Sequence, residues 1–103
     1  MLKWLKNFRK KDQKRLGECT LHADSPEQAI TVALTWLTAG RISAYPKSGH
    51  YDIHVYEAKQ PMLNGFYQIP LENFSPKDVL SMTLGEFVSK FRVGDALGVE
   101  EAE

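Results

Sequence analysis

The sequence predicts a small α+β domain of two layers, in which helices lie on one face of a mostly antiparallel sheet of about four strands. The chain has 103 residues, 43% of them hydrophobic, which suffices for one hydrophobic core. Several stretches alternate between apolar and polar residues, as strands do. Others show helical spacing behind capping residues. The predicted order is a basic N-terminal helix followed by β-α-β-β-β-α.

The first fifteen residues differ in charge from the rest of the chain. They carry seven basic residues against one acidic residue, a net charge of +6, whereas the rest carries six basic and twelve acidic residues. We therefore distinguish a basic lead helix (1–15), one α+β domain (16–94) and an acidic tail (95–103). An apolar stripe with helical spacing predicts that this segment is a helix over about residues 2–11. The stripe consists of Met1, Trp4, Leu5 and Phe8.

Residues 16–23, LGECTLHA, alternate in polarity and predict the first strand. Cys19, Leu21 and Ala23 would share its apolar face. A helix separates this strand from the next, so we consider a parallel pairing of the two through a right-handed β-α-β crossover. A thiol buried among apolar groups is inert, and we therefore expect no nucleophilic catalysis at Cys19.

The clearest helical segment begins after Ser25. Ser25 is a favourable N-cap, Pro26 fits the first helical position, and Gln28 completes a capping box. Gly40 is predicted to end the helix in the left-handed conformation. The predicted apolar stripe consists of Ile30, Ala33, Leu34 and Leu37, widened by Ala29, Val32 and Trp36, with Thr31, Thr35 and Thr38 on the opposite side.

The second half of the chain predicts three strands and a further helical region. Two β-rich stretches flank a turn at Pro46–Gly49, which is typical of a hairpin. Residues 65–71, GFYQIPL, predict another strand. Ser75 and Pro76 repeat the cap signal, and Thr83 with Glu86 offers a second capping box before a main helix from about Leu84.

The stretch HYDIH contains the sharpest candidate for chemistry. On a strand, His50, Asp52 and His54 point to one face, and imidazole and carboxylate are zinc ligands. His50 and His54 are too far apart to bind one ion easily, since the Cα atoms of residues four apart on a strand are separated by roughly 13 Å. The alternative interpretation is the solvated face of an antiparallel strand. We favour the solvated face and keep the metal site as a hypothesis.

No catalytic or cofactor motif occurs in the sequence. The glycines form no phosphate-binding loop, and no HExxH is present. We therefore expect a protein that is not an enzyme and has no cofactor. The single cysteine fits a reducing compartment, and no stretch approaches the ~20 apolar residues of a membrane span. These features favour a cytoplasmic protein.

Our first functional hypothesis is a small binding or regulatory protein that contacts a protein partner. The contact would use its charged ends and its polar, aromatic sheet face, which includes Tyr56.

The second hypothesis is a peripheral factor that binds an anionic membrane surface or nucleic acid through residues 1–15. Self-association through a free sheet edge is a further expectation. The basic residues that could bind a partner are Lys3, Lys6, Arg9, Lys10, Lys11, Lys14 and Arg15.

Overall fold

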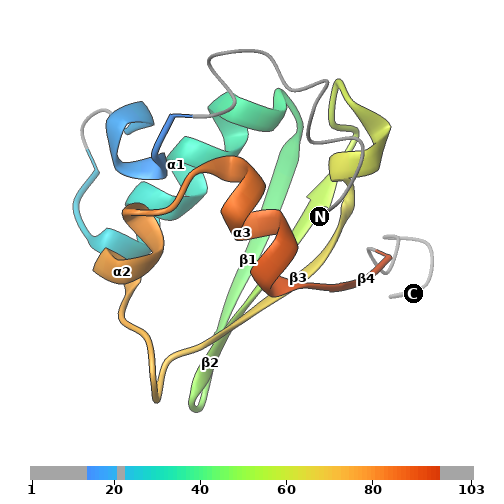
Figure 1. Cartoon of the computed structure of the whole chain (residues 1–103). Helices are drawn as coiled ribbons and strands as arrows, with labels where there is room; N and C mark the ends of the chain where they lie inside the picture. Colours follow the sequence, from blue (N-terminus) through green and yellow to red (C-terminus); the bar gives the residue numbers. More distant parts are fainter. Residues whose placement is uncertain (1–13, 21–22, 96–103) are drawn as a thin grey trace.

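The structure is a computed structural model that describes residues 14–20 and 23–95. Its sheet has the order β1-β2-β3-β4, and all neighbouring strands are antiparallel. The helices α1, α2 and α3 lie together on one side of this sheet (Figure 1). The predicted α+β class is confirmed. The strands are β1 (Arg41–Lys47), β2 (His50–Tyr56), β3 (Gly65–Pro70) and β4 (Arg92–Gly94).

The helical elements have mixed lengths. Within residues 14–20 and 23–95, two are 3-10 helices, η3 and η4, and three are α-helices. The predicted lead helix over residues 2–11 and the acidic tail from residue 96 onward lie outside the described residues. The helical bounds are η3 (Leu16–Cys19), α1 (Pro26–Thr38), η4 (Pro61–Leu63), α2 (Pro76–Leu80) and α3 (Leu84–Phe91).

The strand predicted for residues 16–23 was wrong in its described part, residues 16–20 and 23, while Leu21 and His22 lie outside the described residues. Leu16–Cys19 form η3 instead, and Leu16 is completely buried in the core. The amide of Leu16 donates to the carbonyl of Met82, and Arg15 makes an isolated β-bridge with Thr83. These contacts with distant residues favour the 3-10 helix more strongly than the alternation of polar and apolar residues over 16–23 favours a strand. Among the described strands, β1 therefore pairs with β2 alone, and the parallel crossover does not form.

The N-terminus of α1 follows the prediction with one difference. The Ser25 hydroxyl accepts a hydrogen bond from the amide of Gln28 at 3.1 Å, and Pro26 begins the helix. The side-chain oxygen of Gln28 accepts from the amide of Asp24 at 2.6 Å, rather than from Ser25 as a capping box requires. The cap still satisfies a helical amide that would otherwise lack an acceptor.

The C-terminus of α1 differs from the prediction. Ala39, not Gly40, adopts the left-handed conformation, with φ of 56°. Gly40 is required for space, since a Cβ there would lie 2.5 Å from the carbonyl oxygen of Tyr56. The glycine thus permits close contact between the helix end and the last residue of β2.

Two side chains of α1 differ from the prediction in their exposure to solvent. Trp36, expected in the apolar stripe, is 50% exposed. Thr38, expected on the polar side, is 2% exposed. Its hydroxyl donates to the carbonyl of Leu34 at 2.6 Å and accepts from the amide of Gly40 at 3.2 Å. The buried threonine is tolerated because both bonds satisfy its oxygen.

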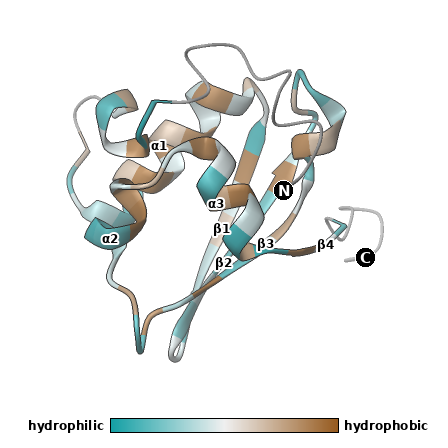
Figure 2. Cartoon of the chain, viewed as in Figure 1, coloured by the Kyte–Doolittle hydropathy of each residue, from teal (hydrophilic) through white to brown (hydrophobic). Residues whose placement is uncertain are grey.

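The predicted capping residues of α2 and α3 are confirmed. Ser75 and Asp78 form a capping box at the start of α2, and Thr83 and Glu86 form one at the start of α3. Hydrophobic and hydrophilic segments alternate along α3 (Figure 2). The residues of α3 that are buried are Leu84, Phe87, Val88 and Phe91, which have the spacing of one helical face.

The core lies between the helices and the sheet. Tyr67 of β3 is almost completely buried there and stacks on Phe87 of α3, with ring centroids 5.2 Å apart. Its hydroxyl donates to the carbonyl of Leu63 at 2.7 Å. Burial raises the pKa of Tyr67 to about 12, against an opposing effect of Arg92. The tyrosine thus stays neutral and joins the two layers.

Adjacent substitutions at the end of α1 should have opposite effects on stability. Gly40→Ala should lower the free energy of unfolding by about 1 to 3 kcal/mol, because the added methyl group overlaps the Tyr56 carbonyl. Ala39→Gly should leave it unchanged or raise it by about 1 kcal/mol, because glycine relieves the left-handed strain. Urea unfolding measures both, and a neutral Gly40→Ala would contradict the proposed close contact.

Candidate functional site

The candidate site lies on the sheet face opposite the helices. In β2 the residues Tyr51, Ile53 and Val55 are buried, while the alternate residues are only partly buried. The three buried residues belong to the core cluster shared with α1 and α3. Strand alternation therefore places the other side chains of β2 on the outer face, and these are His50, Asp52, His54 and Tyr56.

Sheet register gathers further side chains around His54. Phe66 of β3 lies directly opposite His54, and Tyr45 of β1 lies opposite Asp52. Residues paired in this way share one face of the sheet. We call the resulting group of Tyr45, His54, Tyr56 and Phe66 the aromatic face.

The rings of the aromatic face contact one another in a defined geometry. His54 stacks on Phe66 with centroids 4.7 Å apart and an interplanar angle of 18°. It is also nearly parallel to Tyr56, at 6.0 Å and 7°. Tyr45 meets His54 edge to face, at 5.9 Å and 75°. His54 is therefore the centre of the group and contacts each of the other three rings.

The imidazole of His54 lies in a mainly apolar environment. Its Nδ1 atom is buried and has no hydrogen-bond partner among the described residues. Burial lowers the pKa of His54, and the negative charge of Asp52 opposes this effect only in part. The neutral imidazole is thus the form that fits between the rings near pH 7.

A polar group adjoins the aromatic face on the side of the hairpin turn. Nδ1 of His50 lies 2.8 Å from Oδ1 of Asp52, and Nε2 of Gln68 donates to the same carboxylate oxygen at 3.1 Å. At the other end of the face, the guanidinium of Arg41 lies 5.7 Å from the centroid of the Tyr56 ring. Arg41 also pairs with Glu57 at 3.1 Å.

The predicted metal ligands share one face but have different neighbours. His50 contacts Asp52, whereas His54 is surrounded by aromatic rings. Within residues 14–20 and 23–95, no three His, Cys, Asp or Glu side chains form a group that could hold a metal ion. A metal centre at His50, Asp52 and His54 stays a prediction, without support from this geometry.

Only two of the basic residues predicted to bind a partner are described. Lys14 is exposed, and the guanidinium of Arg15 donates to the carbonyl of Ser81. Arg15 thus attaches the start of the domain to the segment between α2 and α3. Lys3, Lys6, Arg9, Lys10 and Lys11 lie outside the described residues.

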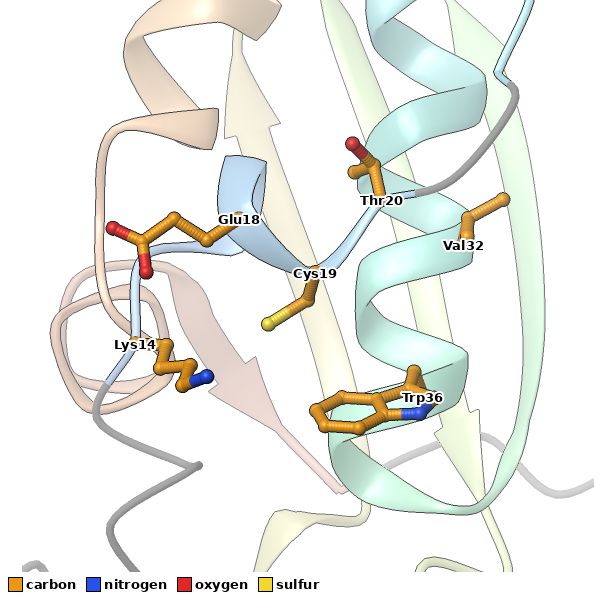
Figure 3. A pocket seen from close by; sticks show the side chains of 6 residues that line it. All are labelled: Lys14, Glu18, Cys19, Thr20, Val32 and Trp36. Atoms are coloured by element: carbon orange, nitrogen blue, oxygen red, sulfur yellow. The ribbon is translucent and has the colours of Figure 1, made fainter.

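A cavity of about 300 Å³ lies between η3 and α1. The Cys19 thiol points into the space between Lys14 and Trp36 (Figure 3). The sequence does not predict this cavity, because its local pattern indicates a strand at Cys19 and a core position for Trp36. Its other lining residues are Glu18, Thr20 and Val32.

Comparison of the chain with protein-family models, curated proteins and solved structures finds no match. Within the described ranges, no helix has the length and hydrophobicity needed to cross a membrane.

The buried imidazole should make stability depend on pH. Because the folded state lowers the pKa of His54 below its usual 6.5, the unfolded chain binds the proton more readily. This contribution to stability is present above pH 6.5 and is lost as the pH falls through the folded-state pKa. NMR titration should give His54 a pKa below 6.5, and His54→Phe should weaken the acid dependence of urea unfolding. A measured pKa at or above 6.5 would contradict this account.

Proposed function

We propose that the protein is a small, non-enzymatic binding protein that contacts a protein partner through the aromatic face. The observation that carries this proposal is the group of four rings around His54 on the sheet face opposite the helices. Tyr45 is 48% exposed, and the other three are partly exposed. Apolar groups gathered on a surface typically mark interaction sites, and tyrosine is enriched in protein interfaces.

The orientation of the rings favours a protein over single-stranded nucleic acid. Base-binding sheets offer free ring faces on which bases stack. Here Phe66 and Tyr56 each direct one ring face at His54, and the guanidinium of Arg41 lies over the Tyr56 ring. Fewer ring faces are therefore left for the stacking of bases, which favours an amphipathic protein surface as the partner.

The charges around the aromatic face also favour a protein partner. A nucleic-acid site needs cations that neutralise phosphates. Arg41 is already paired with Glu57, and the carboxylate of Asp52 lies on the same face. Lys47 is the other basic residue of β1 on this face. The acid dependence of His54 does not alter this balance at neutral pH, where its imidazole is uncharged.

Two finer points belong to this proposal. The chain has a single cysteine and therefore no intramolecular disulfide, which supports a cytoplasmic location, where thiols stay reduced. The basic residues 1–15 provide a second candidate surface for an anionic membrane or nucleic acid. Sedimentation with anionic liposomes and a salt-dependent oligonucleotide titration would test that second surface.

Affinity capture from the native host tests the aromatic face. Tyr45→Ala and Phe66→Ala should weaken retention of a specific partner by about tenfold or more, because central aromatic residues dominate interface energies. Met62→Ala is the matched control, since Met62 is 40% exposed but belongs to η4 rather than to the aromatic face. Circular dichroism should show that all three variants remain folded.

The variants also distinguish the outcomes. A partner retained by Met62→Ala and lost by both aromatic variants supports the proposal. A partner retained equally by all three, or binding that is lost only after removal of residues 1–15, would overturn it in favour of another surface.

A further inference from the structure

The strand β1 forms one edge of the sheet and exposes part of its backbone. Lys47 pairs with His50 across the two-residue turn Ser48–Gly49. The pair that closes such a hairpin is hydrogen-bonded, and the backbone groups of a strand alternate in direction. Ile42 and Ala44 therefore direct their amides and carbonyls away from β2. No backbone bond to another described segment engages these groups.

The position of Pro46 fits this assignment. Pro46 alternates with Ile42 and Ala44, so its nitrogen also faces the free edge. Proline has no amide hydrogen and is found in sheets at such edge positions. The opposite edge, β4, has only three residues, whereas β1 has seven. Among the described strands, β1 is therefore the edge that can accept a further strand of useful length.

We propose that β1 pairs in antiparallel orientation with β1 of a second copy of this chain, about a two-fold axis at Ser43. The two four-stranded sheets would then form one continuous sheet. This is an isologous contact, in which both copies use the same residues. It goes beyond partner binding by the aromatic face and does not depend on it.

The backbone selects this register. With Ser43 opposite its own copy, Ile42 lies opposite Ala44 of the second copy, and the converse pair forms by symmetry. Each of these pairs exchanges two hydrogen bonds. A register shifted by two residues places Ile42 opposite Pro46, which cannot donate. A shift in the other direction places Ala44 opposite Gly40, outside the strand.

The side chains are complementary in the same register. Arg41 lies opposite Tyr45 of the second copy on the outer face, and this pair occurs twice. The Arg41 side chain is 63% exposed and already contacts the Tyr56 ring on its other side. A second ring would place the cation between two aromatic groups, which is a favourable arrangement. On the core side, the partly buried Ile42 meets Ala44.

The proposed dimer would bring two aromatic faces onto one surface. A partner with two matching sites would gain affinity, because its second contact becomes intramolecular. The dimer itself should be weak and dependent on concentration, because five strand residues bury less than the roughly 1,600 Å² of a standard interface.

Cysteine cross-linking tests the register directly. In a Cys19→Ser background, Ser43→Cys places two thiols opposite each other in a pair without backbone hydrogen bonds, where Cα atoms are about 4.5 Å apart. A disulfide accepts roughly 4.4–6.8 Å. With diamide as oxidant, non-reducing gels should show covalent dimer that forms about tenfold or more faster than in the control, because pairing raises the effective thiol concentration.

The control is Lys47→Cys in the same background. Position 47 is on the same strand and face, but its two copies would be roughly 27 Å apart along the paired strands. Because Lys47 is exposed and has no contact in the proposed dimer, random collision would link this variant at least as readily. Fast linkage of Ser43→Cys alone supports the proposal. Equal linkage of both variants, or a monomeric Ser43→Cys, would overturn it and leave the edge to a different partner.

Discussion

The aromatic face depends on the burial of alternate residues of β2. Tyr51, Ile53 and Val55 enter the core beneath the helices, so their neighbours have to point to the opposite face. A slip of one residue would bring His54 into the core and expose Ile53, which burial of the apolar side chains prevents. The hydrophobic effect on one side of the sheet thus positions the rings on the other.

The aromatic face is partly shielded from solvent, and this burial lowers the pKa of His54. Three rings surround the imidazole, its Nδ1 lacks a partner among the described residues, and its pKa is lowered. The neighbouring His50 instead contacts a carboxylate and an amide. Two histidines four residues apart on one strand therefore have different environments, because cross-strand neighbours supply most of the contacts.

The aromatic face and the edge of β1 are linked through Tyr45 and Arg41. Tyr45 belongs to the aromatic face and also lies opposite Arg41 in the proposed dimer, while Arg41 contacts Tyr56 within one chain. Partner binding and self-association would consequently influence each other. Substitution at Tyr45 affects both surfaces, whereas substitution at Phe66, on the third strand, concerns the aromatic face alone. Comparison of the two variants separates the effects.

The sequence by itself determined the elements whose signals are local: the caps at Ser25, Ser75 and Thr83, the hairpin, and the alternation that puts His50, Asp52 and His54 on one face. These depend on neighbouring residues and on periodicity. Only the tertiary structure decided that Leu16–Cys19 form a helix, that Trp36 is exposed, and that Arg92–Gly94 supply the fourth strand. It also brought Tyr45 and Phe66 to His54. Each of these outcomes depends on contacts between distant segments, whose energies outweigh local preference and leave no periodic trace in the chain.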